Sequence, residues 1–304
     1  MSTEKVFSGI GSVPTGSASD KITEGCICLE GGAFRGVYTS GVLDALMEED
    51  INFRCTVGVS AGALNGVNYA SDQIGRSGRI NLRYRHDKRY VGTTALKNNK
   101  GIIGFDFVFG DMENVEPLDT ERLMRPDRQF YAAATSLETG KTEYFEKNQC
   151  SDIYKAVQAS ASMPFVSKPV LIDGRPYLDG GCSSKIPYRF GLDGDFEKVV
   201  VVRTRFRTFR KPLKPSRRVR SEDVVYKDYP EFAAALRASN YCYNCQCDEI
   251  ELLEKKGRIF VLGPSENMSI GRLEPDMEKL GALYLLGYND TKARIDELKE
   301  FLSK

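Results

Sequence analysis

The sequence lacks several features that would place it in other classes of protein. No run of its 304 residues approaches the ~20 apolar residues that a membrane-spanning helix needs, and the first 25 residues lack the apolar core of a signal peptide. Lys and Arg number 43 against 42 Asp and Glu, so there is no large net charge to attract nucleic acid, and no nucleic-acid partner is expected. Eight cysteines without a secretion signal indicate reduced thiols rather than a disulfide framework. These absences predict a cytoplasmic protein that at most rests on the inner face of a membrane.

Apolar runs of strand length alternate with segments of helical spacing along most of the chain. Strands are expected at residues 25–30, 54–59, 129–135, 142–146, 198–203 and 258–262, and helices at residues 36–50, 61–70, 154–162, 231–256 and 275–302. A compact hairpin is expected around Asp173 and Gly174, whereas the polar residues 71–99 predict an exposed helix or excursion rather than core. The alternation predicts an α/β fold with a mainly parallel sheet covered on both faces, in which the four valines at residues 199–202 are the best candidate for a central strand.

The organisation into domains follows from the same pass along the chain. Residues 1–24 are rich in Ser, Gly and Thr and predict a flexible leader. No internal repeat and no clear linker interrupts residues 25–304. We therefore expect a single domain over residues 25–304, with a helical C-terminal part over residues 230–304.

A G-x-S-x-G pentapeptide at residues 58–62 stands where an apolar strand gives way to a helical segment. A serine at such a sharp turn adopts a strained backbone conformation and projects its hydroxyl at the carboxyl edge of the sheet, while Gly58 and Gly62 leave room for the neighbouring elements. The N–H of Ala61 lies at the positive end of the following helix. Ser60 is therefore a candidate nucleophile. The alternative is a glycine-rich turn with an N-capping serine.

A glycine-rich loop at residues 31–36 precedes the first expected helix. Successive backbone N–H groups of Gly31, Gly32 and Ala33 can form a nest that holds an oxyanion or a phosphate. The loop departs from the dinucleotide fingerprint G-x-G-x-x-G at Ala33, and no acidic residue follows a second strand at the required spacing. Arg35 either holds the shape of the loop, which we favour, or meets a substrate phosphate, and Gly36 leads into the helix.

The sequence offers little choice of base for Ser60. Its one histidine, His86, lies in a polar stretch and precedes the candidate acid, whereas the triad histidine of α/β-hydrolases follows its acid. No lysine occupies the third position after Ser60, so a Ser-x-x-Lys arrangement is absent too. Asp179 ends a short apolar strand and is followed by Gly180 and Gly181, which makes it the candidate base. The alternative is an Asp-Gly-Gly turn that closes a hairpin.

Three blocks occur in the order found in patatin-like phospholipases: G-G-A-F-R-G at residues 31–36, G-V-S-A-G at residues 58–62 and D-G-G at residues 179–181. The chain resembles this family over roughly residues 25–210, because the stretch A-S-A-S-M-P at residues 159–164 and the valine-rich strand extend the likeness. The resemblance implies a three-layer α/β/α sandwich and a Ser-Asp dyad without histidine. Ser60 would attack an acyl ester, Asp179 would accept its proton, and the glycine loop would form the oxyanion hole. The resemblance also implies a phospholipid, a lysophospholipid or another acyl-ester lipid as substrate, and a reaction that requires no cofactor and no metal.

Two positions depart from the family pattern. The third glycine of the loop is Ala33 in this chain, which a backbone-donor role tolerates only if φ at that position is below zero. After the D-G-G block the family often carries an Asp-Pro-x-Pro-like stretch, where this chain has S-S-K-I-P at residues 183–187. Neither change removes a catalytic group, and both bear on the choice of substrate.

A basic segment from Arg203 to Arg220 holds nine Lys or Arg and no acid. Such a segment suits contact with an anionic membrane surface, and the alternatives are a solvated loop, which we favour, and RNA binding.

A cysteine cluster occurs later in the chain, where Cys242, Cys245 and Cys247 form C-x-x-C-x-C. A fourth zinc ligand would have to come from a distant residue, so we expect Cys242 and Cys245 to be buried thiols on one face of a helix rather than metal ligands. Cys182, close to Asp179, is expected to pack rather than react.

The function predicted from these features is a serine acyl hydrolase of lipid esters. One alternative is a catalytically weak regulator that binds lipid or a protein partner on the same fold. The other is a nucleotide-binding module that uses residues 31–36. The missing fingerprint glycine at Ala33 and the G-x-S-x-G turn at residues 58–62 both count against it.

Overall fold

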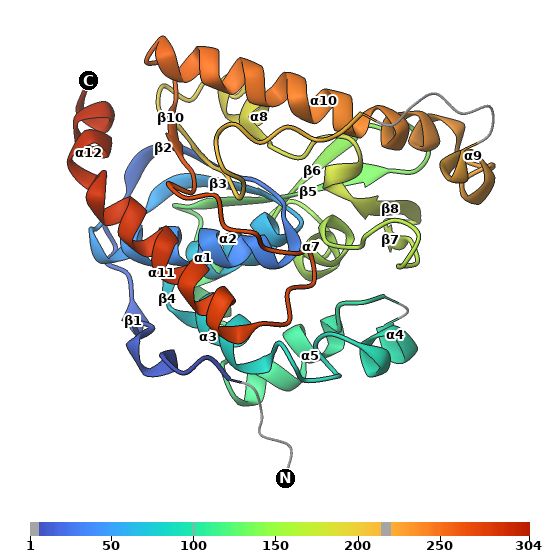
Figure 1. Cartoon of the computed structure of the whole chain (residues 1–304), viewed down its shortest axis with the longest axis horizontal. Coiled ribbons are helices and arrows are strands. Elements are labelled where there is room, and N and C mark those ends of the chain that lie inside the picture. Colours follow the sequence, from blue (N-terminus) through green and yellow to red (C-terminus); the bar gives the residue numbers. More distant parts are fainter. Residues whose placement is uncertain (1–5, 100, 214–219) are drawn as a thin grey trace.

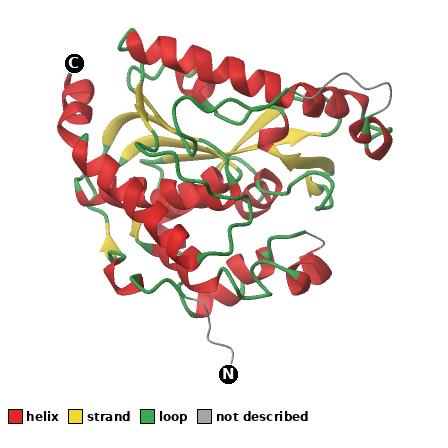
Figure 2. Ribbon diagram, in the orientation of Figure 1, coloured by secondary structure: helices red, strands yellow, loops and turns green. Residues whose placement is uncertain are grey.

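The computed structural model describes residues 6–99, 101–213 and 220–304, and these form three layers with a sheet in the middle and helices on both faces (Figures 1 and 2). The strands of the sheet are β2 (Thr23–Leu29), β3 (Phe53–Val59), β5 (Gln129–Ser136), β6 (Thr142–Glu146), β7 (Val170–Ile172), β8 (Arg175–Asp179), β9 (Val199–Val202) and β10 (Phe260–Leu262). They lie in the order β10-β9-β2-β3-β5-β8-β7, and β6 also pairs with β5. The pairs from β10 to β5 are parallel, and β6, β8 and β7 pair antiparallel. The predicted α/β fold with a mainly parallel sheet is confirmed.

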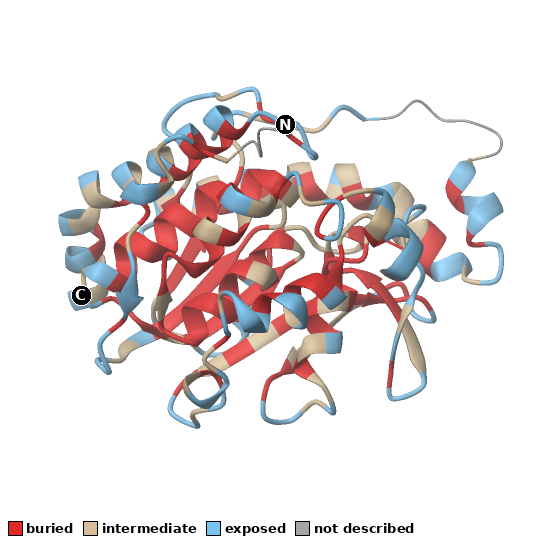
Figure 3. Cartoon of the chain, turned by 90° about the horizontal axis from the view of Figure 1, so that it is seen from below, coloured by how far each residue is buried: buried red, intermediate tan, exposed pale blue. Residues whose placement is uncertain are grey.

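The helices cover both faces of this sheet. They are α1 (Val37–Glu48), α2 (Ala61–Ala70), α3 (Arg76–Tyr84), α4 (Thr93–Asn99), α5 (Phe105–Phe109), α6 (Thr120–Leu123), α7 (Ile153–Ser160), α8 (Tyr188–Asp193), α9 (Ser221–Val225), α10 (Pro230–Lys255), α11 (Met277–Ala293) and α12 (Ile295–Ser303). Helices α1, α2, α7 and α11 lie on one face, and α8 and α10 lie on the other (Figure 1). Buried residues follow the strands and the inner sides of the helices (Figure 3). Among the described helices, none combines the length and the apolar character needed to cross a bilayer.

The four valines of β9 show how the two cores are built. Val200 and Val202 pack in the core beneath α1 and α11, whereas Val199 and Val201 pack in the core beneath α8 and α10. Successive side chains of a strand point to opposite faces, so a strand covered on both sides is apolar throughout. This strand lies between β2 and β10, one position from the edge of the sheet rather than at its centre.

Residues 6–22 differ from the loose leader that the sequence predicts, and residues 1–5 lie outside the described part. Phe7 is buried against α11, where a Cβ added at Gly281 would overlap its ring. A short strand β1 (Gly16–Ser17) pairs with β4 (Gln73–Ile74), and the N–H of Ala18 donates to the carbonyl of Asp72 at 2.8 Å. The apolar side chains here are single residues among Ser and Gly, so they form no periodic pattern that would have revealed the packing.

Two further segments differ from the expectations. Helix α3 lies in the polar segment 71–99, yet it buries Ile80 and Leu82 in the core beneath α1 and α11. Its Arg79 is paired with Glu116 at 2.9 Å. The helix expected at residues 275–302 is broken between α11 and α12 at Arg294, whose guanidinium donates to the carbonyl of Val261 at 2.6 Å in β10.

A buried carboxyl joins α1 to α11 and to the turn before α3. Asp44 accepts a hydrogen bond from the hydroxyl of Tyr284 at 2.6 Å and one from the N–H of Gly75 at 2.8 Å. Burial raises the pKa of Asp44 from its ordinary 3.8 to about 7, although both hydrogen bonds act in the opposite direction. The folded state therefore favours the protonated carboxyl.

The free energy of unfolding should fall as the pH rises from about 4 to about 7, because Asp44 ionises in the unfolded chain well before it does so in the folded one. Ionisation of Asp44 should lower the free energy of unfolding by on the order of 4 kcal/mol, and this decrease should level off above the folded-state pKa of Asp44. Urea denaturation of the wild type and of Asp44→Asn across this pH range measures it. Asn cannot ionise, so the difference between the two proteins should change with pH by this amount; parallel curves would contradict the assignment.

Candidate active site

Ser60 lies in a sharp turn between β3 and α2. Its backbone angles are φ 56° and ψ −121°, a combination that non-glycine residues rarely adopt and that costs about 1–3 kcal/mol. The flanking glycines make the turn possible: a Cβ added at Gly58 would lie 2.5 Å from the nitrogen of Ala63, and one added at Gly62 would overlap the carbonyl oxygen of Leu29. The G-x-S-x-G spacing therefore has a steric cause, and it presents the serine at the carboxyl edge of the sheet.

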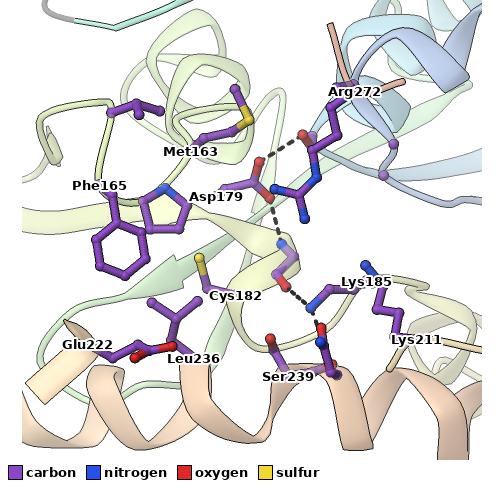
Figure 4. Close-up of a pocket in the computed structure, with 18 of the residues that line it drawn as sticks. Met163, Phe165, Asp179, Cys182, Lys185, Lys211, Glu222, Leu236, Ser239 and Arg272 are labelled. Atoms are coloured by element: carbon purple, nitrogen blue, oxygen red, sulfur yellow. Dashed lines mark hydrogen bonds between the residues drawn. The ribbon is translucent and has the colours of Figure 1, made fainter. Parts of the chain in front are cut away.

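Asp179 ends β8 beside this turn. Its Oδ2 accepts a hydrogen bond from Ser60 Oγ at 2.8 Å, and its Oδ1 accepts one from the N–H of Gly181 at 2.7 Å (Figure 4). The backbone is fixed as well, because the N–H of Asp179 donates to the carbonyl of Ser162 at 2.9 Å and its carbonyl accepts from Thr135 Oγ1 at 2.9 Å. The structure thus brings together two residues that lie far apart in the sequence.

Asp179 as a whole is 7% exposed. Burial raises its pKa, while the hydrogen bonds from Ser60 and from the Gly181 amide lower it, and so do the charges of Lys185 and Arg272. The net direction is upward, which brings the affinity of the carboxylate for a proton closer to what a general base requires.

Gly180 has a packing reason for being glycine. A Cβ at this position would overlap the carbonyl oxygen of Ala133 in β5. The D-G-G block therefore allows the chain after β8 to pass close against the sheet.

The glycine loop lies directly beside Ser60, since a Cβ at Gly31 would lie 3.1 Å from the Cβ of Ser60. The N–H of Gly31 donates to the carbonyl of Lys185 at 3.1 Å and is therefore already engaged. Within the described residues, the N–H groups of Gly32, Ala33 and Ala61 have no hydrogen-bond partner. These three amides are the ones available to an oxyanion.

Ala33 does not meet the condition that the sequence sets for it. Its φ is +51°, in the left-handed region, rather than below zero. An alanine in this region costs roughly 1–2 kcal/mol, which the surrounding packing must offset. Arg35, in the same loop, is buried and donates to the carbonyl of Ile270 at 3.4 Å, and Gly36 abuts Ala61, because an added Cβ would lie 2.7 Å from that side chain.

A cavity of about 730 Å³ opens over Ser60 and Asp179. One part of its wall is apolar and includes Met163, Pro164, Phe165, Val166, Leu213, Leu236 and Leu273. Another part carries the basic side chains of Lys185, Lys211 and Arg272 (Figure 4). A second cavity of about 50 Å³ also reaches Ser60, between Phe34 and Ile103. None of these side chains was predicted to line the site. Some belong to stretches that the sequence analysis singled out for other reasons, such as Met163 in A-S-A-S-M-P and Lys185 in S-S-K-I-P, and the others come from segments that carry no motif.

His86 lies apart from this arrangement. It is exposed, it is not among the residues that line the cavity, and its Nε2 lies 2.8 Å from the carbonyl oxygen of Pro275. The geometry offers it no contact with Ser60.

Part of the basic segment is paired with acids where the structure describes it. Arg203 is buried, with its Nε 3.9 Å from Glu30, and Arg210 pairs with Asp248 at 2.7 Å and with Glu251 at 2.8 Å on α10. Residues 214–219 of the segment lie outside the described part. The charges that are paired in this way are less available to a membrane surface.

The cysteines of α10 differ from the expectation. Cys245 is exposed and Cys242 is half-buried, whereas Cys247 is buried and its sulfur accepts a hydrogen bond from Arg203 at 3.0 Å. The buried face of α10 is set by Tyr243, Cys247 and Ile250 at helical spacing, so Cys245 falls on the outer face. No three His, Cys, Asp or Glu side chains are grouped to hold a metal ion in the part of the chain that the structure describes.

The chain matches two sequence-family models. A sequence model of the family described as patatin-like phospholipase matches residues 27–191, more than half of the chain, and the chain belongs to this family. Residues 229–303 match a second family model, described as a domain of unknown function (DUF6363). The second match begins one residue before α10 and includes β10, which is part of the same sheet.

Several relatives share the first region. YjjU of Escherichia coli (strain K12) is 30% identical over 182 residues, which cover 58% of this chain and 50% of that protein. Lysophospholipase nte1 of Aspergillus terreus is 30% identical over 185 residues, covering 56% of this chain and 11% of that protein. The probable lipid hydrolase 463L of Invertebrate iridescent virus 6 is 23% identical over 242 residues, covering 70% of this chain and 82% of that protein. The chain therefore spans half or less of the first two.

The fold also resembles a solved structure. VipD from Legionella pneumophila superposes with a TM-score of 0.51 at 15% sequence identity, and the match covers 92% of this chain and 68% of that chain. At this level of identity the likeness concerns the fold alone.

Proposed function

We propose that the protein is a serine acyl hydrolase that cleaves carboxylic esters of lipids with a Ser60–Asp179 dyad. The observation that carries the proposal is the 2.8 Å hydrogen bond from Ser60 Oγ to Asp179 Oδ2 at the base of a cavity with an apolar wall. Membership of the patatin-like family and the names of two relatives, a lysophospholipase and a probable lipid hydrolase, support a phospholipid or lysophospholipid substrate.

The first half of the reaction transfers the acyl group to the enzyme. Asp179 Oδ2 takes the proton of Ser60 Oγ as this oxygen forms a bond to the ester carbonyl carbon. The carbonyl oxygen becomes an oxyanion, which the N–H groups of Gly32, Ala33 and Ala61 would stabilise; one such donor is typically worth about 3 kcal/mol in the transition state. The ester bond then breaks, and the leaving alkoxide takes the proton from Asp179.

The second half releases the acyl group. Asp179 accepts a proton from water as the water oxygen attacks the acyl-enzyme carbonyl, and the proton passes to Ser60 Oγ when the acyl–serine bond breaks. The free fatty acid leaves, and the hydrogen bond between Ser60 and Asp179 is restored.

Hydrolysis of short and long p-nitrophenyl esters and of a lysophospholipid tests the assignment of the nucleophile. Ser60→Ala should reduce kcat by at least ~10³-fold, because the acyl-enzyme cannot form. His86→Ala is the control and should keep wild-type activity, since its side chain lies outside the cavity. A fluorophosphonate should label the wild type and His86→Ala but not Ser60→Ala.

Two outcomes would argue against the proposal. Equal loss of activity in His86→Ala would reject the dyad. An inactive wild type that no fluorophosphonate labels would favour a regulator on the same fold, which binds its partner without turnover.

A further inference from the structure

Three basic side chains lie on one side of Asp179, opposite the apolar wall that includes Met163 and Phe165 (Figure 4). They are Lys185, Lys211 and Arg272, which we call the cationic wall. They come from the segment after the D-G-G block, from the segment after β9 and from the loop before α11. Within the described residues none of the three forms an ion pair with an acid.

Each of these side chains is positioned by contacts of its own. Lys185 donates from Nζ to the carbonyl of Gly181 at 2.7 Å and to that of Ser239 at 3.2 Å. These contacts engage two of its three N–H donors with neutral carbonyl groups.

Lys211 is held by α10. Its backbone N–H donates to Asn244 Oδ1 at 2.8 Å and its carbonyl accepts from Asn244 Nδ2 at 3.0 Å, while its Nζ lies 4.9 Å from the centre of the Tyr243 ring. Arg272 is anchored through its carbonyl, which accepts from the N–H of Phe34 at 3.2 Å beside the glycine loop.

The acids near the cationic wall are already engaged. Asp179 is bonded to Ser60 and Gly181, and Glu30 accepts from the N–H of Thr204 at 2.7 Å. Burial, together with the charges of Lys185 and Arg272, lowers the pKa of Lys211 to about 7. Like charges gathered in a partly buried wall destabilise one another, and an anion between them would relieve that repulsion.

We propose that Lys185, Lys211 and Arg272 form an anion-binding subsite that receives the phosphate group of an acyl-ester lipid beside Ser60. The inference rests on the proposed acyl hydrolase function and narrows its substrate class. The cavity has an apolar wall for an acyl chain and a cationic wall for a phosphate, so an amphiphile that carries both groups satisfies both walls. A phosphate monoester head group, with its greater negative charge, should be preferred over a zwitterionic head group, and both over an uncharged glycerol.

Hydrolysis of three lipids with the same acyl chain tests this preference: a lysophospholipid with a phosphate monoester head, one with a choline head and the uncharged monoacylglycerol. Lys211→Met keeps most of the side-chain length but removes the charge, and it should raise KM for the phosphate monoester about tenfold while leaving KM for monoacylglycerol unchanged. Arg272→Met should act in the same way, and Lys211→Arg should restore the preference. Lys255→Met, exposed near the end of α10, is the matched control and should behave as the wild type.

The pattern across substrates separates binding of phosphate from an influence on the base. If Lys211→Met and Arg272→Met slow the hydrolysis of all three lipids alike, the cationic wall acts through the pKa of Asp179 or through the fold, and the subsite is rejected. Thermal unfolding of each variant identifies any loss of folding.

Direct binding tests the subsite without catalysis. In the Ser60→Ala protein, calorimetry would compare a 1-O-alkylglycerol phosphate, whose ether cannot be hydrolysed, with the 1-O-alkylglycerol and with inorganic phosphate. The ether-lipid phosphate should bind at least about tenfold more tightly than the alkylglycerol, and adding Lys211→Met should abolish this difference.

Three other outcomes of the binding experiments would each lead to a different conclusion. Inorganic phosphate that binds as tightly as the ether-lipid phosphate would assign the subsite to free phosphate and overturn its assignment to a lipid. Affinities that are unchanged by Lys211→Met would overturn the subsite itself. Binding that depends on Lys211 in a protein that hydrolyses no ester would support the subsite while the proposed function failed.

Discussion

Asp179→Asn should abolish turnover while the protein remains folded. Asparagine can still accept from the Gly181 amide and remain close to Ser60, so the turn after β8 should keep its shape. It cannot take the serine proton, and no histidine reaches the site to replace it. We expect kcat to fall by on the order of 10⁴-fold, the scale seen when a catalytic carboxylate loses its charge or an essential dyad member is removed.

The matched control is Asp173→Asn. Asp173 also precedes a glycine at a turn beside β8, but it is exposed and lies outside the cavity. Its φ of +50° is a conformation that asparagine adopts readily. Kinetics and thermal unfolding of both variants should show full activity in the control and unchanged folding in both. Substantial residual activity in Asp179→Asn would mean that another group removes the proton from Ser60.

The pH dependence of the wild type follows from the same residue. Asp179 must be ionised to accept a proton, and burial raises its pKa. As the pH falls through that raised pKa, kcat/KM should fall, and the inflection should lie above the ordinary range of an aspartate.

Of the substitutions proposed, Gly41→Ala should lower the free energy of unfolding most. Gly41 lies in α1 where this helix crosses α11, and a Cβ added there would overlap the carbonyl oxygen of Tyr284 and lie 2.8 Å from the nitrogen of Tyr288. The relation is reciprocal, because a Cβ at Gly287 in α11 would overlap the carbonyl oxygen of Tyr38. Backbone cannot move aside as a side chain can, so the two helices would have to separate. The free energy of unfolding should fall by about 3 kcal/mol or more.

This effect opposes the intrinsic preference of the helix. Alanine is favoured over glycine within an isolated helix by about 1 kcal/mol, so a variant limited by helix propensity would become more stable. Urea denaturation decides between the two directions. Gly11→Ala is the control, since an added Cβ there meets nothing within 4 Å, and it should change stability little. Stabilisation by Gly41→Ala would show that the backbones of α1 and α11 leave room for a Cβ at this position.

The packing of α1 on α11 also bears on the site. The loop before α11 carries Arg272, whose carbonyl is bonded to Phe34 beside the glycine loop. The C-terminal part of the chain thus supplies both the packing partner of α1 and a side chain of the cavity over Ser60 and Asp179. It does so although the patatin-like match ends at residue 191.

The local parts of the fold and of the site could be predicted because their causes are local. The turn at Ser60 requires small residues at Gly58 and Gly62, where a Cβ would strike the backbone, and this requirement leaves a fixed spacing in the sequence. The helix that follows begins and ends where it was expected. The buried strands are apolar throughout, because both faces of the sheet are covered.

Other features of the structure have no recognisable pattern in the sequence. Ala33 has a positive φ that its residue type argues against, and the packing of residues 6–22 rests on isolated side chains such as Phe7. The arginines of α3 and of the basic segment give the composition of an exposed surface, yet Arg79 and Arg210 are paired with acids from other segments. The composition of a segment shows how many charged side chains it has but not which acids from other segments they pair with.

The amino-acid sequence by itself determined the strand-turn-helix units, the candidate nucleophile and the candidate base, since each depends on residues within a few positions of one another. Only the tertiary structure decided that Ser60 and Asp179 are 2.8 Å apart, that the N–H of Gly31 is engaged, and that Lys185, Lys211 and Arg272 share one wall of the cavity. The reason is that these relations join segments distant in the chain, and the distance between two such side chains is set by how the sheet and its covering helices pack.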